Sequence, residues 1–193
     1  MNTRKFLLSF VISGLLLISC SDDDDNPDPV NPEEVITTMV VTLIDGSDVV
    51  TLRFFDEDGD DPTDPVVTVS GPLKSNTTYN GSIRILNETE DPAGEVNDEI
   101  KEEAEEHQFF YITDDLGITT AYADKESDYV SDAGDNPVGI EFTLTTTEQT
   151  GDADLKVELR HEPNKEAEGV ADGDITNAGG EPDIEWTFNI EVD

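Results

Sequence analysis

The stretch IEWTFNIEV, residues 184–192, decides the expected fold of this chain. Every second residue is apolar, from Ile184 through Trp186 to Val192, and the residues between them are polar. Successive side chains of a β-strand point to opposite faces of the sheet, so this alternation predicts a strand with one face buried and the other in solvent.

The rest of the body shows the same period of two or a β-rich composition. Asp45-Gly46-Ser47-Asp48 separates two such runs and predicts a hairpin. We expect a mainly β protein, an antiparallel β-sandwich of about eight or nine strands, with a closed barrel as the alternative. The other expected strands are 35–44, 49–55, 66–70, 77–85, 109–113, 118–123, 138–144 and 155–159.

One acidic helix is expected between two of these strands. Asp91-Pro92 has the composition of a helix start, and the apolar residues Val96, Ile100 and Ala104 follow at a spacing of four. Most of the other positions as far as Glu106 are acidic, which predicts a helix packed at an edge or end of the sandwich. Residues 163–182, rich in glycine and acidic residues, are expected to form a long loop.

The N-terminus has the pattern of an export signal. Arg4 and Lys5 precede an apolar run at 6–18, which is too short to span a bilayer. The run ends in Leu-Ile-Ser-Cys, which resembles the lipobox of bacterial lipoproteins, and Cys20 is the only cysteine of the chain. This resemblance implies a signal peptide at 1–19, cleaved before Cys20, whose thiol receives a diacylglycerol.

An acidic, proline-rich segment follows the cysteine. Residues 22–25 are four aspartates, and three prolines stiffen 26–32. Acidic residues directly after the lipidated cysteine resemble the surface-export signal of Bacteroidetes-type lipoproteins, which implies an outer-membrane protein facing the cell exterior. We therefore expect a tether at 20–32 and a sandwich domain at 33–193.

The charge of the chain excludes one class of partner. Its 193 residues have a formal net charge of −37, and removal of the predicted signal peptide would make it −39. Neutralising phosphates requires a basic face, which this chain cannot supply, so we expect no nucleic-acid binding. Cations and basic protein surfaces are the plausible charged partners.

Both histidines of the chain lie among carboxylates. On the expected helix, Glu99, Glu103 and His107 would share one face, and a Glu and a His four residues apart can chelate a divalent metal. His161 falls on the same inward-facing side of the expected strand as Leu155, Val157 and Leu159, so it would lie at the rim of the sandwich. Its imidazole is a ligand type that suits Zn, Cu, Fe or Ni. A solvated acidic helix and a core-capping histidine are the alternatives.

A second cation candidate lies at 56–61. Asp56, Asp58 and Asp60 alternate around Gly59 in a pattern that resembles part of a calcium loop. The twelfth position, counted from Asp56, holds Val67, whereas a full calcium loop has Glu there. The alternative is a solvated acidic turn. Zn or Ca is thus a possible cofactor, and none is certain.

Catalytic signals in the sequence are weak, although its many carboxylates would allow a glycosidase-type pair. It has no Gly-x-Ser-x-Gly elbow, no His-Glu-x-x-His and no phosphate-binding loop. We expect a protein that is not an enzyme.

The lipobox, the acidic tether, and the segments EEHQFFY at 105–111 and LRHEPNK at 159–165 resemble a family of small flavobacterial surface lipoproteins. That family is often named "type 1 periplasmic binding fold superfamily protein". The expected function is capture of a ligand or metal ion as an accessory to an outer-membrane uptake receptor. The alternative is a structural or adhesive surface module whose acidity keeps it soluble in a saline medium.

Overall fold

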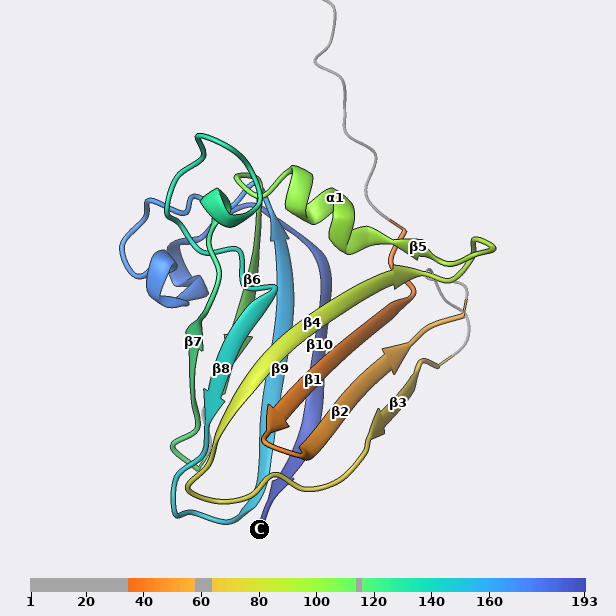
Figure 1. Cartoon of the computed structure of the whole chain (residues 1–193), viewed down its shortest axis with the longest axis vertical. Helices are drawn as coiled ribbons and strands as arrows, with labels where there is room; N and C mark the ends of the chain where they lie inside the picture. Colours follow the sequence, from red (N-terminus) through yellow and green to blue (C-terminus); the bar gives the residue numbers. More distant parts are fainter. Residues whose placement is uncertain (1–34, 58–63, 114–115) are drawn as a thin grey trace, which may run out of the picture. The chain divides into compact units, whose positions relative to one another are not determined.

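The computed structural model describes residues 35–57, 64–113 and 116–193. The predicted signal peptide at 1–19, the lipidation site Cys20 and the tether at 20–32 lie outside these residues. The described part contains ten strands in two antiparallel sheets (Figure 1). Their bounds are β1 Thr38–Asp45, β2 Asp48–Phe55, β3 Val66–Val69, β4 Thr78–Asn87, β5 Gly94–Glu95, β6 His107–Ile112, β7 Thr119–Tyr122, β8 Glu141–Thr145, β9 Gly151–His161 and β10 Glu181–Val192.

The two sheets stack around one hydrophobic core. The larger has seven strands in the order β3-β2-β1-β4-β8-β7, with β5 added beside β4, and the smaller has the order β10-β9-β6. Inward residues such as Met39, Phe142, Leu155 and Phe188 are fully buried between them. The expected sandwich is confirmed, and the alternative of a closed barrel is wrong.

Each of the nine expected strand segments contains a strand. The expected hairpin is also present, since β1 and β2 pair in register up to Asp45 and Asp48. Gly46 supplies the turn with a φ of +59°, a conformation that other residues rarely adopt. The two-residue strand β5 was not expected, because two residues carry no periodicity.

The acidic helix exists but is shorter than expected. Helix α1 spans Val96–Glu102, so its predicted start at Asp91-Pro92 and its predicted extension to His107 are wrong. At the start, Gly94 and Glu95 pair with β4 instead. At the end, tertiary pairing prevails over helix propensity, because β6 begins at His107 and pairs with β9. The buried Asn97 holds the helix on β4 by accepting from Ile85 N and donating to Ile83 O.

The expected loop at 163–182 covers part of the outer face of the three-stranded sheet. It contains two 3₁₀ turns, η2 (Val170–Asp172) and η3 (Ile175–Asn177), and it ends where β10 starts at Glu181. Val170 and Ala178 bury Phe110, an outward residue of β6. Gln108, also outward on β6, donates to Val170 O and to the Tyr122 hydroxyl. The loop is therefore a packed third layer over that face.

The outward strand positions of the seven-stranded sheet hold few carboxylates. Within the six strands of its main path, the described outward positions hold one carboxylate, Glu141. The two arginines of this face are paired with glutamates from outside the path, Arg53 with Glu88 at 2.9 Å and Arg84 with Glu95. The other outward residues are Thr38, Val40, Thr42, Ile44, Val49, Thr51, Phe55, Val66, Thr68, Thr78, Asn80, Ser82, Leu86, Thr119, Ala121, Thr143 and Thr145.

Candidate metal centre

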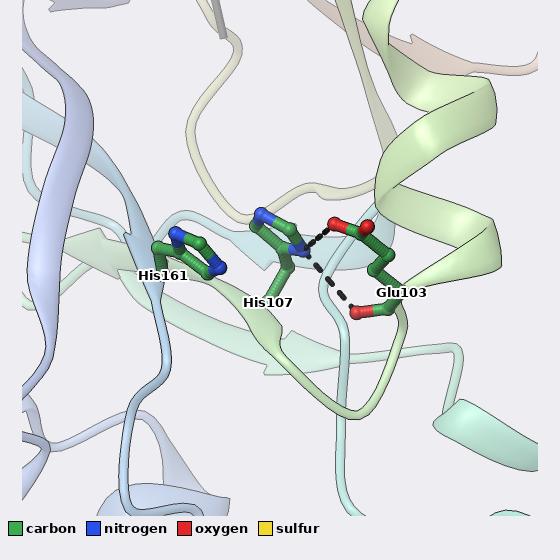
Figure 2. Close-up of side chains that lie close together, drawn as sticks. All are labelled: Glu103, His107 and His161. Carbon is green, nitrogen blue, oxygen red and sulfur yellow. Dashed lines mark hydrogen bonds and ion pairs between the residues drawn. The ribbon is translucent and has the colours of Figure 1, made fainter. Parts of the chain in front are cut away.

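The two histidines of the chain meet at one end of the three-stranded sheet. His107 is the first residue of β6 and His161 the last of β9, and the register pairs them directly. Their imidazole rings stack with centroids 4.7 Å apart and planes 4° from parallel. Figure 2 shows His107 between His161 and Glu103. The parity of β9 predicted the rim position of His161, but the pairing with His107 required the strand order.

Glu103 reaches the same histidine from the turn after α1. Its carboxylate Oε2 lies 3.9 Å from His107 Nδ1, and its backbone carbonyl accepts a hydrogen bond from that nitrogen at 3.2 Å. One ligand atom from each of Glu103, His107 and His161 lies within 4.8 Å of the other two. The predicted proximity of Glu103 and His107 is confirmed, although a turn produces it and the predicted shared helical face with Glu99 is wrong.

Asp183 is part of the site and was not predicted. Its carboxylate Oδ2 lies 3.6 Å from His107 Nε2, and its side chain is 6% exposed. A register shift between Pro182 and Ile184 makes Asp183 the extra residue of a bulge. The alternation of β10 predicted only the residues from Ile184 onward, and a bulge leaves no periodic signal.

A second group of candidate ligands also includes His161. Glu106, His161 and Glu162 also place one ligand atom each within 4.8 Å of one another. Glu106 Oε2 lies 3.8 Å from His161 Nε2, and Glu162 N donates to Glu106 O at 2.6 Å. Glu106 and Glu162 are exposed, whereas His107 is buried. His161 therefore belongs to two ligand sets, which we call the inner set (Glu103, His107, His161) and the outer set (Glu106, His161, Glu162).

Burial favours the neutral form of His107. Desolvation lowers the pKa of His107 below its ordinary 6.5, and the positive charge that His161 can acquire acts in the same direction. The Glu103 carbonyl and the Asp183 and Glu103 carboxylates oppose the shift without overcoming it. Metals bind neutral imidazole, so the lowered pKa favours binding, but an ion at Nδ1 would also have to displace the hydrogen bond to Glu103 O.

The stacked arrangement of the rings determines how an ion can bind. A zinc ion lies about 2.0–2.1 Å from each nitrogen that binds it, close to the plane of the ring. Two parallel rings cannot both satisfy this condition for an ion between them, so one ring has to turn. His161 is the more exposed of the two, with 21% of its side chain accessible against 3% for His107. Its Nε2 atom has no hydrogen-bond partner among the described residues, so turning costs it no such bond.

A buried ion pair supports the turn beside the site. Lys165 Nζ lies 3.0 Å from Glu126 Oε1, with both side chains 4% exposed, and it also donates to Ala104 O and Pro137 O. Burial lowers the pKa of Lys165, and Glu126 opposes that shift. The lysine thus ties the covering loop to the turn that carries Glu103. Sequence reasoning missed it, since an isolated lysine in a polar loop is ordinarily solvated.

The calcium candidate lies mostly outside the described residues. Asp56 follows β2 and is partly buried, with its backbone N–H donating to Thr37 O and its Oδ1 without a hydrogen-bond partner among the described residues. Asp58 and Asp60 lie outside the described residues, so this hypothesis stays a prediction.

None of the described helices has the length and apolar character needed to cross a lipid bilayer.

Comparisons with known proteins do not assign the chain to a family. The chain matches no protein-family model, no curated protein and no solved structure.

Proposed function

We propose that this protein is a non-enzymatic, lipid-anchored surface protein that captures a divalent transition-metal ion at the inner set. One observation carries the proposal: both histidines of the chain converge across β6 and β9 and have Glu103 beside them. Glu103 and Asp183 also place a carboxylate near each nitrogen of the buried His107 ring, which supports the proposal.

The ligand chemistry favours zinc, with copper and nickel as its competitors. Imidazole and carboxylate are ligand types that bind zinc in proteins, whereas calcium takes six to eight oxygen ligands. If Nδ1 of His107 held the ion, its proton would have to leave the hydrogen bond with Glu103 O and reside on Nε2, which faces Asp183 Oδ2 at 3.6 Å. A carboxylate behind a metal-binding histidine is the common arrangement in zinc proteins, because it orients the ring and raises its basicity.

The place of action is proposed from the sequence. The lipobox at Cys20 and the aspartates at 22–25 support an anchor in the outer membrane with the domain facing the cell exterior. The strong negative charge concentrates cations near the domain. An outer-membrane receptor would then take over the captured ion.

Calorimetric titration of the purified, metal-stripped protein with zinc tests the proposal. We expect one ion per chain with a dissociation constant in the micromolar range or below. Glutamine at His107 or at His161 should weaken binding by at least about 100-fold, because loss of a mere supporting group costs about 10–100-fold. Circular dichroism would confirm that the variants fold. Glu148→Gln is the control, since this exposed residue precedes the opposite end of β9. Binding no tighter than millimolar in the wild type would contradict the proposal.

A second candidate function, surface adhesion, is favoured by the carboxylate-poor outer face of the seven-stranded sheet. It is the face through which two copies of so acidic a chain could approach with the least repulsion. We expect weak association at high salt, where charge repulsion is screened. Sedimentation equilibrium should then detect dimers that Ser82→Asp abolishes and that Thr187→Asp, on the three-stranded sheet, leaves intact. A monomer at every concentration would exclude this role, as would a rise in melting temperature with calcium beyond that with sodium at matched ionic strength.

A further inference from the structure

We propose, resting on the metal-capture function above, that His161 transfers the ion from the outer set to the inner set. The exposed outer set receives the ion first, and rotation of the His161 ring carries it to His107 and Glu103. The site thus holds one ion and loads in two steps.

The two ligand sets share one imidazole, and this sharing is the basis of the inference. Each set contains three ligand atoms within 4.8 Å of one another, and His161 is the member common to both. An imidazole ring that binds one ion does not normally bind a second. The sets therefore compete for His161, and an ion held by one set excludes an ion from the other.

The sets differ in exposure and in chemistry. The outer set has two exposed glutamates around a partly buried histidine, whereas the inner set has a buried histidine and two partly buried residues. Carboxylates on the surface attract a hydrated cation quickly, and nitrogen ligands hold zinc, copper and nickel more selectively. Fast capture outside and selective retention inside are the properties that these two sets would provide.

The backbone around His161 keeps both sets in place while the ring turns. Glu162 adopts a φ of +52° and donates from its backbone N–H to Glu106 O, which holds the outer carboxylates near each other. On the other side, β9 pairs with β6 and fixes His161 opposite His107. Movement of the ion then requires side-chain rotation of His161, which has no hydrogen bond on Nε2 among the described residues to break.

Stopped-flow competition between the protein and a fluorescent zinc chelator tests the transfer. The variant E106Q/E162Q should bind one zinc ion with nearly the wild-type dissociation constant, because the inner set is intact. Its association rate constant should fall by about tenfold, the lower end of the effect of local charge on capture rates. The variant His107→Gln should show the reverse, with rapid but weak binding at the outer set.

The matched control is E102Q/E105Q, which removes the same charge from exposed residues of the preceding segment without touching either set. An association rate that falls equally in this control would overturn the transfer, since general attraction would then explain the effect. Two zinc ions bound per wild-type chain would overturn it as well. Failure of the proposed function gives a different result, namely no zinc binding by the wild type.

Discussion

His107 and His161 face each other across the first and last residues of two paired strands, and their rings stack at 4.7 Å. The relationship depends on the register of β6 against β9. A shift of one residue would turn one of the two side chains to the opposite face of the sheet. The candidate metal centre is thus a property of strand pairing.

Asp183 should act on the metal through His107. We expect Asp183→Asn to weaken zinc binding by about 10–100-fold, because an amide supports the Nε2–H less strongly than a carboxylate does. Calorimetry measures the change. Asp154→Asn, an exposed substitution on β9, is the control and should leave the affinity unchanged. Equal affinities of Asp183→Asn and the wild type would show that Asp183 does not support the ligand.

Gly180 should be required for the position of His161. A Cβ at Gly180 would lie 2.2 Å from His161 O, whereas at Gly179 nothing lies within 4 Å. Both glycines have a positive φ, +68° and +61°, so alanine costs backbone strain of about 1–2 kcal/mol at either. We expect Gly180→Ala to lower the free energy of unfolding more than Gly179→Ala does, and to weaken zinc binding. Denaturant unfolding and calorimetry would measure both, and indistinguishable variants would contradict the packing described.

The buried pair of Lys165 and Glu126 should be strongly coupled. Lys165→Met leaves a buried carboxylate without its ion partner, and we expect it to destabilise the protein by about 3–5 kcal/mol. Adding Glu126→Leu should recover part of that loss, since two apolar side chains replace an ion pair at lower cost than one charge left alone. Urea unfolding of the two single variants and the double variant measures the coupling. Additive effects would show that the two groups do not interact.

Glu88 should contribute stability that depends on pH. The Thr38 hydroxyl, at 2.6 Å, and Arg53 hold the pKa of Glu88 below its ordinary 4.5. Because the folded pKa is lower than the unfolded one, the contribution is complete above about pH 4.5 and disappears as the pH falls through the folded pKa.

Unfolding measured from pH 7 to pH 3 tests this expectation. The destabilisation caused by Glu88→Gln should shrink on acidification, and Thr38→Val should behave in the same way. Thr78→Val removes a hydroxyl contact to Thr145 that involves no carboxylate, so its effect should not vary with pH. A constant effect of Glu88→Gln would contradict the assigned hydrogen bond.

The sequence predicted the sandwich because alternation over five or more residues reports which face of a strand is buried. It predicted the rim position of His161 for the same reason. It did not predict the end of α1 at Glu102, since Glu102 to Glu106 are good helix formers and the pairing of His107 with β9 is a long-range contact. Asp183 was missed because a bulge interrupts the alternation. The sequence also failed to predict the burial of Glu158. This residue points outward from β9, yet its side chain is 1% exposed and forms ion pairs with Lys156 and Arg160.

X-ray absorption spectroscopy of the zinc-loaded protein would identify the atoms that bind the metal. We expect two histidine nitrogens at about 2.0–2.1 Å with carboxylate oxygen completing the shell. His161→Gln should reduce the number of imidazoles to one. A shell of oxygen ligands alone in the wild type would show that the acidic surface, and not the histidine pair, binds the metal.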